Sequence, residues 1–248
     1  MSMGLFTENT RVQVPAALHL CRLGYVYKTR SELVCDQKTN ILVEEFMTAV
    51  ARINPGKNKS EIKALLDNLI SVSSNDDIGR EFYEKIVATS GIRVIDFEHP
   101  GENSWICTTE LPCEDLESHD EFRPDVTCFV NGLPLAFVEV KIPNNRDGIL
   151  AERDRMNVRM ANKVFRPFLN VTQLMIFSNN QEYDKDSRVP VQGAFYATVT
   201  KGSASFSVFR EADPEILAKS GYKAELAPEI EKKILKNRNC LSIRCHSE

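Results

Sequence analysis

Three ionisable residues stand within a largely apolar stretch of this 248-residue chain. Asp125 is followed fourteen residues later by Glu139, and Lys141 comes two residues after Glu139. Because charged groups are costly to place among apolar residues, we expect these three side chains to serve a site. Two carboxylates and an ammonium can bind a divalent metal ion and hold a water molecule beside it. That arrangement suits metal-assisted hydrolysis of a phosphodiester bond.

A β-hairpin is predicted to position the three residues, because Asn131-Gly132 between two apolar runs is a strong hairpin signal. Glu139 and Lys141 must share a face, since side chains alternate along a strand. A strict two-residue loop places Asp125 opposite Val138, on the wrong face. A three-residue loop or a β-bulge sets Asp125 opposite Glu139 instead. In one site, the like charges should raise the pKa of one carboxylate, and Lys141 should partly offset this rise.

The rest of the chain is predicted to be rich in helices first and in strands later. Apolar residues recur at helical spacing over 11–22, 41–53, 60–72, 77–89 and 145–164, and we expect Ser60 to cap the third of these helices. Strands are predicted at 92–97, 104–110 and 171–178, with a second hairpin over 192–199 and 204–209. This order predicts an α/β (α+β) fold.

Composition and charge exclude several classes of protein. The net charge of −4 argues against a protein that coats nucleic acid generally, although a local basic patch could still contact DNA. We expect a cytoplasmic protein with no membrane partner, because the chain has neither an apolar run of about 18 residues nor a secretory signal. No two histidines have the spacing of zinc ligands, and no G-x-x-x-x-G-K-[ST] motif indicates an ATP site.

The stretch V-N-G-L-P-L-A-F-V-E-V-K at 130–141 resembles the nuclease domain that opens the restriction (R, motor) subunit of type I restriction-modification enzymes. The pattern of Asp125 with E-x-K at 139–141 is the PD-(D/E)xK nuclease signature. The short signature occurs by chance, whereas the longer string is more specific. Further similar segments are LGYVY at 23–27, ILAERDRMN at 149–157, NVTQLMIFSNN at 170–180 and GAFYATV at 193–199, so the resemblance covers most of residues 8–210.

The resemblance implies a restriction-endonuclease-like αβββαβ core, a mixed sheet flanked by helices, with the helices at about 41–90 as an insertion. It also implies cleavage of double-stranded DNA with Mg²⁺ (or Mn²⁺). Asp125, Glu139 and the backbone carbonyl of Val140 would bind the metal, and Lys141 would orient the attacking water or stabilise the charge of the transition state. The methylation and specificity subunits of the restriction complex would be its partners. Residues 1–220 would form the nuclease domain, and 221–248 a linker or the start of a motor domain that this fragment lacks.

Two positions depart from the resembled family. Related subunits often carry a Glu on the first helix that can support the metal, and here Gln13 stands at that point. Glutamine ligates only through a neutral carbonyl, which suits Mg²⁺ poorly, so we expect an exposed helix residue, with metal support as the alternative. The helix over 145–164 usually carries a Gln and a Tyr four residues apart, and here Met156 and Met160 take those places.

The helix over 145–164 also carries Arg155, Arg159 and Lys163 at intervals of four residues. This basic stripe could contact DNA phosphates or could be the solvated face of an amphipathic helix. Two alternatives to a nuclease stay open. The departures favour a docking module that binds DNA or other subunits without cutting. A purely structural interpretation makes Asp125 a turn residue after Pro124, and Glu139 with Lys141 an exposed ion pair on an edge strand.

Overall fold

The chain folds around a mixed β-sheet in a computed structural model, which describes residues 12–88, 90–114, 121–142, 148–178, 194–197, 207–208, 226–230 and 232–235. Within these ranges the sheet has seven strands in the order β1-β2-β5-β6-β7-β8-β9. Their bounds are Val26–Tyr27, Trp105–Thr109, Val126–Val130, Leu133–Val140, Leu174–Ser178, Ala194–Ala197 and Ser207–Val208. The pairs β1–β2 and β6–β7 are parallel, and the other neighbours are antiparallel.

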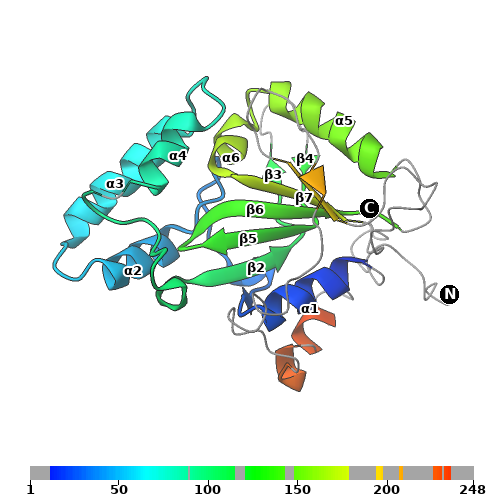
Figure 1. Cartoon of the computed structure of the whole chain (residues 1–248), viewed down its shortest axis with the longest axis horizontal. Helices are drawn as coiled ribbons and strands as arrows, with labels where there is room; N and C mark the ends of the chain where they lie inside the picture. The colour runs from blue at the N-terminus through cyan, green and yellow to red at the C-terminus, as the bar shows by residue number, and fades with distance from the viewer. Residues whose placement is uncertain are drawn as a thin grey trace.

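Helices cover both faces of this sheet (Figure 1). Helix α1 (Val14–Arg22) packs on one face, where its residues Ala17 and Cys21 belong to the same core cluster as Val138 and Val140 of β6. Helices α5 (Gly148–Ala161) and α6 (Arg166–Val171) pack on the other face, in a cluster rich in phenylalanine that includes Phe137. Side chains alternate faces along β6, so its odd-numbered residues at this end point toward α5. Element order α1-β2-β5-β6-α5-β7 confirms the predicted αβββαβ core.

Helices α2 (Val43–Ile53), α3 (Lys59–Val72) and α4 (Arg80–Ile86) gather at one end of the sheet (Figure 1). Their apolar side chains form a core cluster with Val130, Leu133 and Leu135 from the turn end of the β5–β6 hairpin. Apolar residues spaced three and four apart give each helix the face that it buries. The three helices fall in the predicted insertion at 41–90 and bear on the hairpin that carries the candidate site.

The β5–β6 hairpin combines a two-residue turn with a bulge. Asn131 and Gly132 have φ values of 48° and 78°, as a type I′ turn requires, and Val130 pairs with Leu133. The register then shifts, because Cys128 pairs with Ala136. Two β6 residues, Pro134 and Leu135, therefore face the single β5 residue between Cys128 and Val130. A bulge tolerates proline in a central strand, since proline has no N–H for the ladder.

Buried polar contacts hold the turn in place. Asn131 is fully buried, and its Oδ1 accepts from the backbone N–H of Ser104 (2.7 Å). Its Nδ2 donates to the carbonyl of Val94 (2.8 Å) and to Oδ1 of Asn103 (2.8 Å). These contacts supply partners for a polar side chain that would be costly to bury without them. They tie the hairpin turn to two loops that lie far from it in the sequence.

The predicted strand at 92–97 is wrong, because this segment is a series of bends. Its backbone pairs with a side chain instead of a neighbouring strand. The N–H of Asp96 donates to Oδ1 of Asn103 (2.9 Å), and Nδ2 of Asn103 donates to the Asp96 carbonyl (2.7 Å). Val94 is nevertheless buried, which explains why the apolar pattern suggested a strand.

Several element boundaries also differ from the sequence prediction. Asn58, and not Ser60, caps α3, because its Oδ1 accepts from the N–H of Glu61 (3.0 Å). Gly79, with φ 73°, delays the start of the helix predicted at 77–89 to Arg80. Helix α6 and the short pair β3 (Cys113–Glu114) with β4 (Glu121–Phe122) were not predicted. The antiparallel pairing of β8 with β9 confirms the second hairpin.

Parts of the predicted elements lie outside the described residues, namely 11, 89, 145–147, 192–193, 198–199, 204–206 and 209. The division into domains 1–220 and 221–248 stays a prediction. Within 221–248, the structure describes segments 226–230 and 232–235, which Figure 1 draws beside α1. Their residues Leu226, Ile230 and Ile234 belong to the apolar cluster around α1. Over the described ranges, none of the helices has the length and apolar character needed to span a membrane.

Candidate active site

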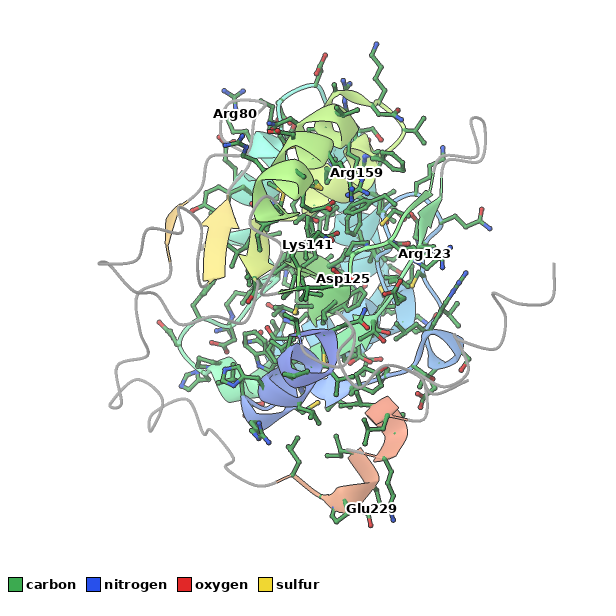
Figure 2. All side chains as sticks on the ribbon, turned by 90° about the vertical axis from the view of Figure 1, so that its right-hand side faces the viewer. Arg80, Arg123, Asp125, Lys141, Arg159 and Glu229 are labelled. Atoms are coloured by element: carbon green, nitrogen blue, oxygen red, sulfur yellow. The ribbon has the colours of Figure 1, made fainter. Side chains whose placement is uncertain are left out.

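The hairpin register brings Asp125 and Glu139 together at the end of β5 and β6. Val126 pairs with Val138, so one step further along the same register sets Asp125 opposite Glu139. Oδ2 of Asp125 accepts a hydrogen bond from the backbone N–H of Val140 (2.7 Å). Of the two predicted alternatives, a three-residue loop or a bulge, the bulge is the one present, and it places both carboxylates on one face despite the two-residue turn. Figure 2 shows Asp125 and Lys141 close together near the centre of the view.

The purely structural interpretation is wrong, in which Asp125 is a turn residue and Glu139 with Lys141 forms an exposed ion pair on an edge strand. Strand β6 lies between β5 and β7, so it is not an edge strand. Glu139 is only 5% exposed, so it cannot be part of an exposed ion pair. Asp125 turns its carboxylate toward Val140 on the neighbouring strand instead of closing a local turn. Burying two carboxylates side by side costs free energy, so the fold accepts a cost that a purely structural pair would avoid.

Burial perturbs both carboxyl groups. Burial is the main cause that raises the pKa of Asp125 to about 6, against the lowering effect of the Val140 N–H and the Lys141 ammonium. Burial, and then the charges of Asp125 and Glu152, raise the pKa of Glu139 well above its usual value. The Lys141 ammonium lowers the pKa of both carboxyl groups and so partly offsets the rise, as predicted. Without a further cation, the pair keeps protons at a pH where free carboxyls have lost them.

A divalent cation fits this pair of carboxylates. Oε1 of Glu139 is buried and has no hydrogen-bond partner among the described residues. The N–H and the C=O of one strand residue point to the same side of the strand, so the Val140 carbonyl also lies on the Asp125 side. No group of three or more His, Cys, Asp or Glu side chains in the described ranges is placed to hold a metal. Mg²⁺ commonly uses one or two carboxylates and completes its shell with water and substrate phosphate.

Glu152 of α5 is a member of this site that the sequence reasoning missed. Its side chain is only 2% exposed, and its Oε2 lies 3.3 Å from Nζ of Lys141. Nη1 of Arg155 donates to Oε2 of Glu152 (2.9 Å), and Nη1 of Arg159 donates to Oε1 (2.8 Å). A signal existed in the sequence, because Glu152 precedes Met156 by four residues and so shares the helix face that is buried.

The predicted basic stripe is only partly present. Arg155 and Arg159 lie on the site side of α5, bound to Glu152, with 64% and 23% of their side chains exposed. The Arg159 guanidinium also lies 4.2 Å from the centre of the Phe122 ring. Lys163 is exposed but comes after α5 ends at Ala161, so the spacing of a continuous helix does not apply to it. The solvated-face interpretation does not hold for Arg159.

With this geometry established, comparison with known proteins identifies the family. The model of the type I restriction enzyme R protein N terminus family matches residues 5–184. The chain belongs to this family.

Two relatives of this R-protein N-terminal domain carry names consistent with the family. The MjaIXP endonuclease subunit of Methanocaldococcus jannaschii, named for a type I restriction enzyme, is 28% identical over 56% of this chain. The type I restriction enzyme HindI endonuclease subunit of Haemophilus influenzae is 28% identical over 42% of this chain. The matched regions cover only 15% and 11% of these two relatives.

The two departures from the family have different structural outcomes. Gln13 is not exposed as expected, because only 4% of it is accessible. Its Nε2 donates to Oε1 of Glu110 (2.6 Å) and to the backbone carbonyl of Asp125 (3.1 Å). Met156 is fully buried in the phenylalanine-rich cluster, and Met160 packs against it. In this R-protein domain the methionines are therefore core residues, whereas Gln13 braces the chain next to the carboxylate pair.

Glu110 is the second site residue that sequence reasoning missed. It follows β2 with φ 55°, and its N–H donates to the Asp125 carbonyl (3.3 Å). Its charge adds to the rise in the pKa of Asp125. Ninety-seven residues separate it from Gln13, so no local pattern could have joined the two.

Proposed function

We propose that this R-protein N-terminal domain hydrolyses phosphodiester bonds of double-stranded DNA with Mg²⁺ or Mn²⁺. One observation carries the proposal. Through a bulge in the central hairpin Asp125 lies opposite Glu139, near Lys141, and one buried carboxylate oxygen of Glu139 has no hydrogen-bond partner among the residues that the structure describes. Two buried carboxylates beside one ammonium cost the fold free energy when no cation is bound, and they suit a divalent cation.

Each residue has a role in this chemistry. Asp125, Glu139 and the Val140 carbonyl would hold the metal, and the Val140 N–H fixes the orientation of the Asp125 carboxylate. The bound ion would polarise the scissile phosphate and acidify a water molecule. Lys141 would orient the attacking water or stabilise the negative charge that develops on the phosphate. Arg155 and Arg159 of α5 would contact DNA phosphates.

We further propose that this domain acts on DNA as part of a larger restriction complex in the cytoplasm. The two relatives are much longer than the region matched, which leaves room in them for other activities. Methylation and specificity subunits would select the DNA, and an ATP-dependent translocase of the complex would deliver it. We therefore expect the isolated chain to cut slowly and without sequence preference.

A second candidate function is a docking module that binds DNA or other subunits without cutting. The observation that favours it is the placement of Met156 and Met160, which are core residues where related subunits carry polar ones. The cleavage proposal is stronger, because Asp125, Glu139 and Lys141 converge.

Metal binding and DNA nicking together test the two candidates. Mn²⁺ binding is measured by calorimetry, and nicking of supercoiled plasmid is followed over hours at micromolar concentrations of the chain. We expect Glu139→Gln to abolish both. The control is Glu84→Gln, which alters an exposed glutamate on α4 and should change neither. Metal binding that survives Glu139→Gln, or the absence of binding with and without DNA, would overturn the cleavage proposal in favour of the docking module.

A further inference from the structure

Glu152 is an unusual residue for its position on α5. It is 2% exposed and shares a helix face with Met156, which is fully buried in the apolar cluster beneath the helix. A buried carboxylate costs several kcal/mol unless cations compensate it, and a hydrophobic residue of similar volume often serves stability as well or better. Glu152 therefore needs an explanation beyond the packing of α5 on the sheet.

The contacts of Glu152 converge on the ammonium of the candidate site. Its Oε2 is shared between Lys141 Nζ (3.3 Å) and Arg155 Nη1 (2.9 Å), while Oε1 accepts from Arg159 Nη1 (2.8 Å). Arg159 is held a second time by its position over the Phe122 ring. One rigid carboxylate thus restricts where the Lys141 and Arg159 head groups can lie. Arg155, with 64% of its side chain exposed, is restrained least.

The charges of this group suit an anionic substrate once a divalent cation is bound. Asp125, Glu139, Glu152 and Glu110 carry four acidic groups, against the three basic groups of Lys141, Arg155 and Arg159. A divalent cation at the carboxylate pair would make the group net positive by one, in a place where burial weakens screening by water. The three basic groups that a DNA phosphate would meet there are all in contact with Glu152.

We propose that Glu152 is a positioning residue for cleavage, which holds the ammonium of Lys141 and the guanidinium of Arg159 toward the DNA phosphate at the Asp125–Glu139 pair. This inference rests on the proposed nuclease function. Glu152 touches neither metal nor substrate and acts through the two cations. It gives α5 a polar contribution to the site although Met156 and Met160 replace the polar pair of related subunits.

The test compares two substitutions on the same helix. Glu152→Gln keeps the size of the side chain and an acceptor for Arg159, but removes the charge that attracts Lys141. Asp154→Asn is the matched control, because Asp154 is 66% exposed and, among the described residues, pairs with the neighbouring Arg153 alone. The nicking rate is measured at saturating plasmid and Mn²⁺, and DNA and Mn²⁺ affinities are measured separately. Thermal unfolding verifies that both variants fold.

We expect Glu152→Gln to lower the saturated rate by about 10- to 100-fold, as misplacement of a reacting group does, while both affinities change by less than about threefold. The ¹H–¹⁵N ammonium signal of Lys141, assigned with Lys141→Arg, should shift in Glu152→Gln and stay unchanged in Asp154→Asn. A wild-type rate in Glu152→Gln, a loss explained by weaker DNA binding, or an unchanged Lys141 signal would refute the positioning role.

The two proposals fail in different ways. If the wild-type chain does not nick DNA, the nuclease proposal and the catalytic purpose of Glu152 fall together, whatever the Lys141 signal does. If the wild type nicks DNA and Glu152→Gln nicks equally well, only the inference about Glu152 falls.

Discussion

Replacing Asp125 by Asn should make the metal-free protein more stable at pH 8, even though it removes a residue of the candidate site. Asparagine has the shape of aspartate, and its Oδ1 can still accept from the Val140 N–H, which lies 2.7 Å from Asp125 Oδ2. What the substitution removes is a negative charge whose pKa burial raises from 3.8 to about 6. The wild-type fold therefore bears the cost of ionising this group at pH 8.

The magnitude follows from linkage between proton binding and folding. The rise from 3.8 to about 6 corresponds to roughly 3 kcal/mol at about 1.36 kcal/mol per pKa unit. Because the folded pKa is the higher one, the stability of the wild type is intact below about pH 4 and declines as the pH rises through about 6. Partial exposure of Asp125 screens the charge. We therefore expect Asp125→Asn to raise the free energy of unfolding by about 1 to 3 kcal/mol at pH 8 and to leave it nearly unchanged at pH 4.

Urea unfolding at pH 4 and pH 8, in the presence of a chelator, measures the effect. A gain of about 1 kcal/mol corresponds to roughly 2–4 °C in melting temperature for a domain of this size. Added Mn²⁺ should stabilise the wild type and not Asp125→Asn, since only the wild type retains both ligands. An Asn variant that is less stable than wild type at pH 8, or a gain equal at both pH values, would show that Asp125 is a structural anchor and that this reasoning is wrong.

Two further predictions concern the turn and the surface of α5. Gly132→Ala should cost more than about 2 kcal/mol in urea unfolding, because φ is 78° and the new Cβ would lie 2.6 Å from the Leu42 carbonyl oxygen; stability like that of wild type would contradict the turn geometry. Arg155→Ala should weaken plasmid binding and reduce the dependence of affinity on salt by about one phosphate contact. A salt slope equal to that of wild type would place Arg155 outside the DNA interface.

The core of the candidate site was predictable because its signals are local. Asn131-Gly132 indicates the turn, and strand alternation then puts Glu139 and Lys141 on one face. The sequence could state only that Asp125 needed a longer loop or a bulge. Proline at 134, inside a run that otherwise reads as a central strand, was the available sign that the bulge was the correct alternative.

The supporting residues were not predictable in the same way, because long-range contacts determine them. Gln13 was expected on the surface, but Glu110, on a different element, meets it at 2.6 Å. Segment 92–97 was expected to be a strand, but Asn103 takes the hydrogen bonds that a neighbouring strand would have supplied. A helical wheel could have flagged Glu152 as buried, yet only the fold shows that Lys141 lies against it.

Contacts at both ends of the β5–β6 hairpin hold its register, and the contacts at the turn end link the helices at 41–90 to the candidate site. At the turn end, the Leu42 N–H at the start of α2 donates to the Gly132 carbonyl (2.8 Å), and the buried amide of Asn131 ties the turn to the loops beside it. At the open end, Val140 donates to Asp125. A slip of one residue between β5 and β6 would move Asp125 to the face away from Glu139. Helices that contribute no reacting group therefore determine whether the two carboxylates meet.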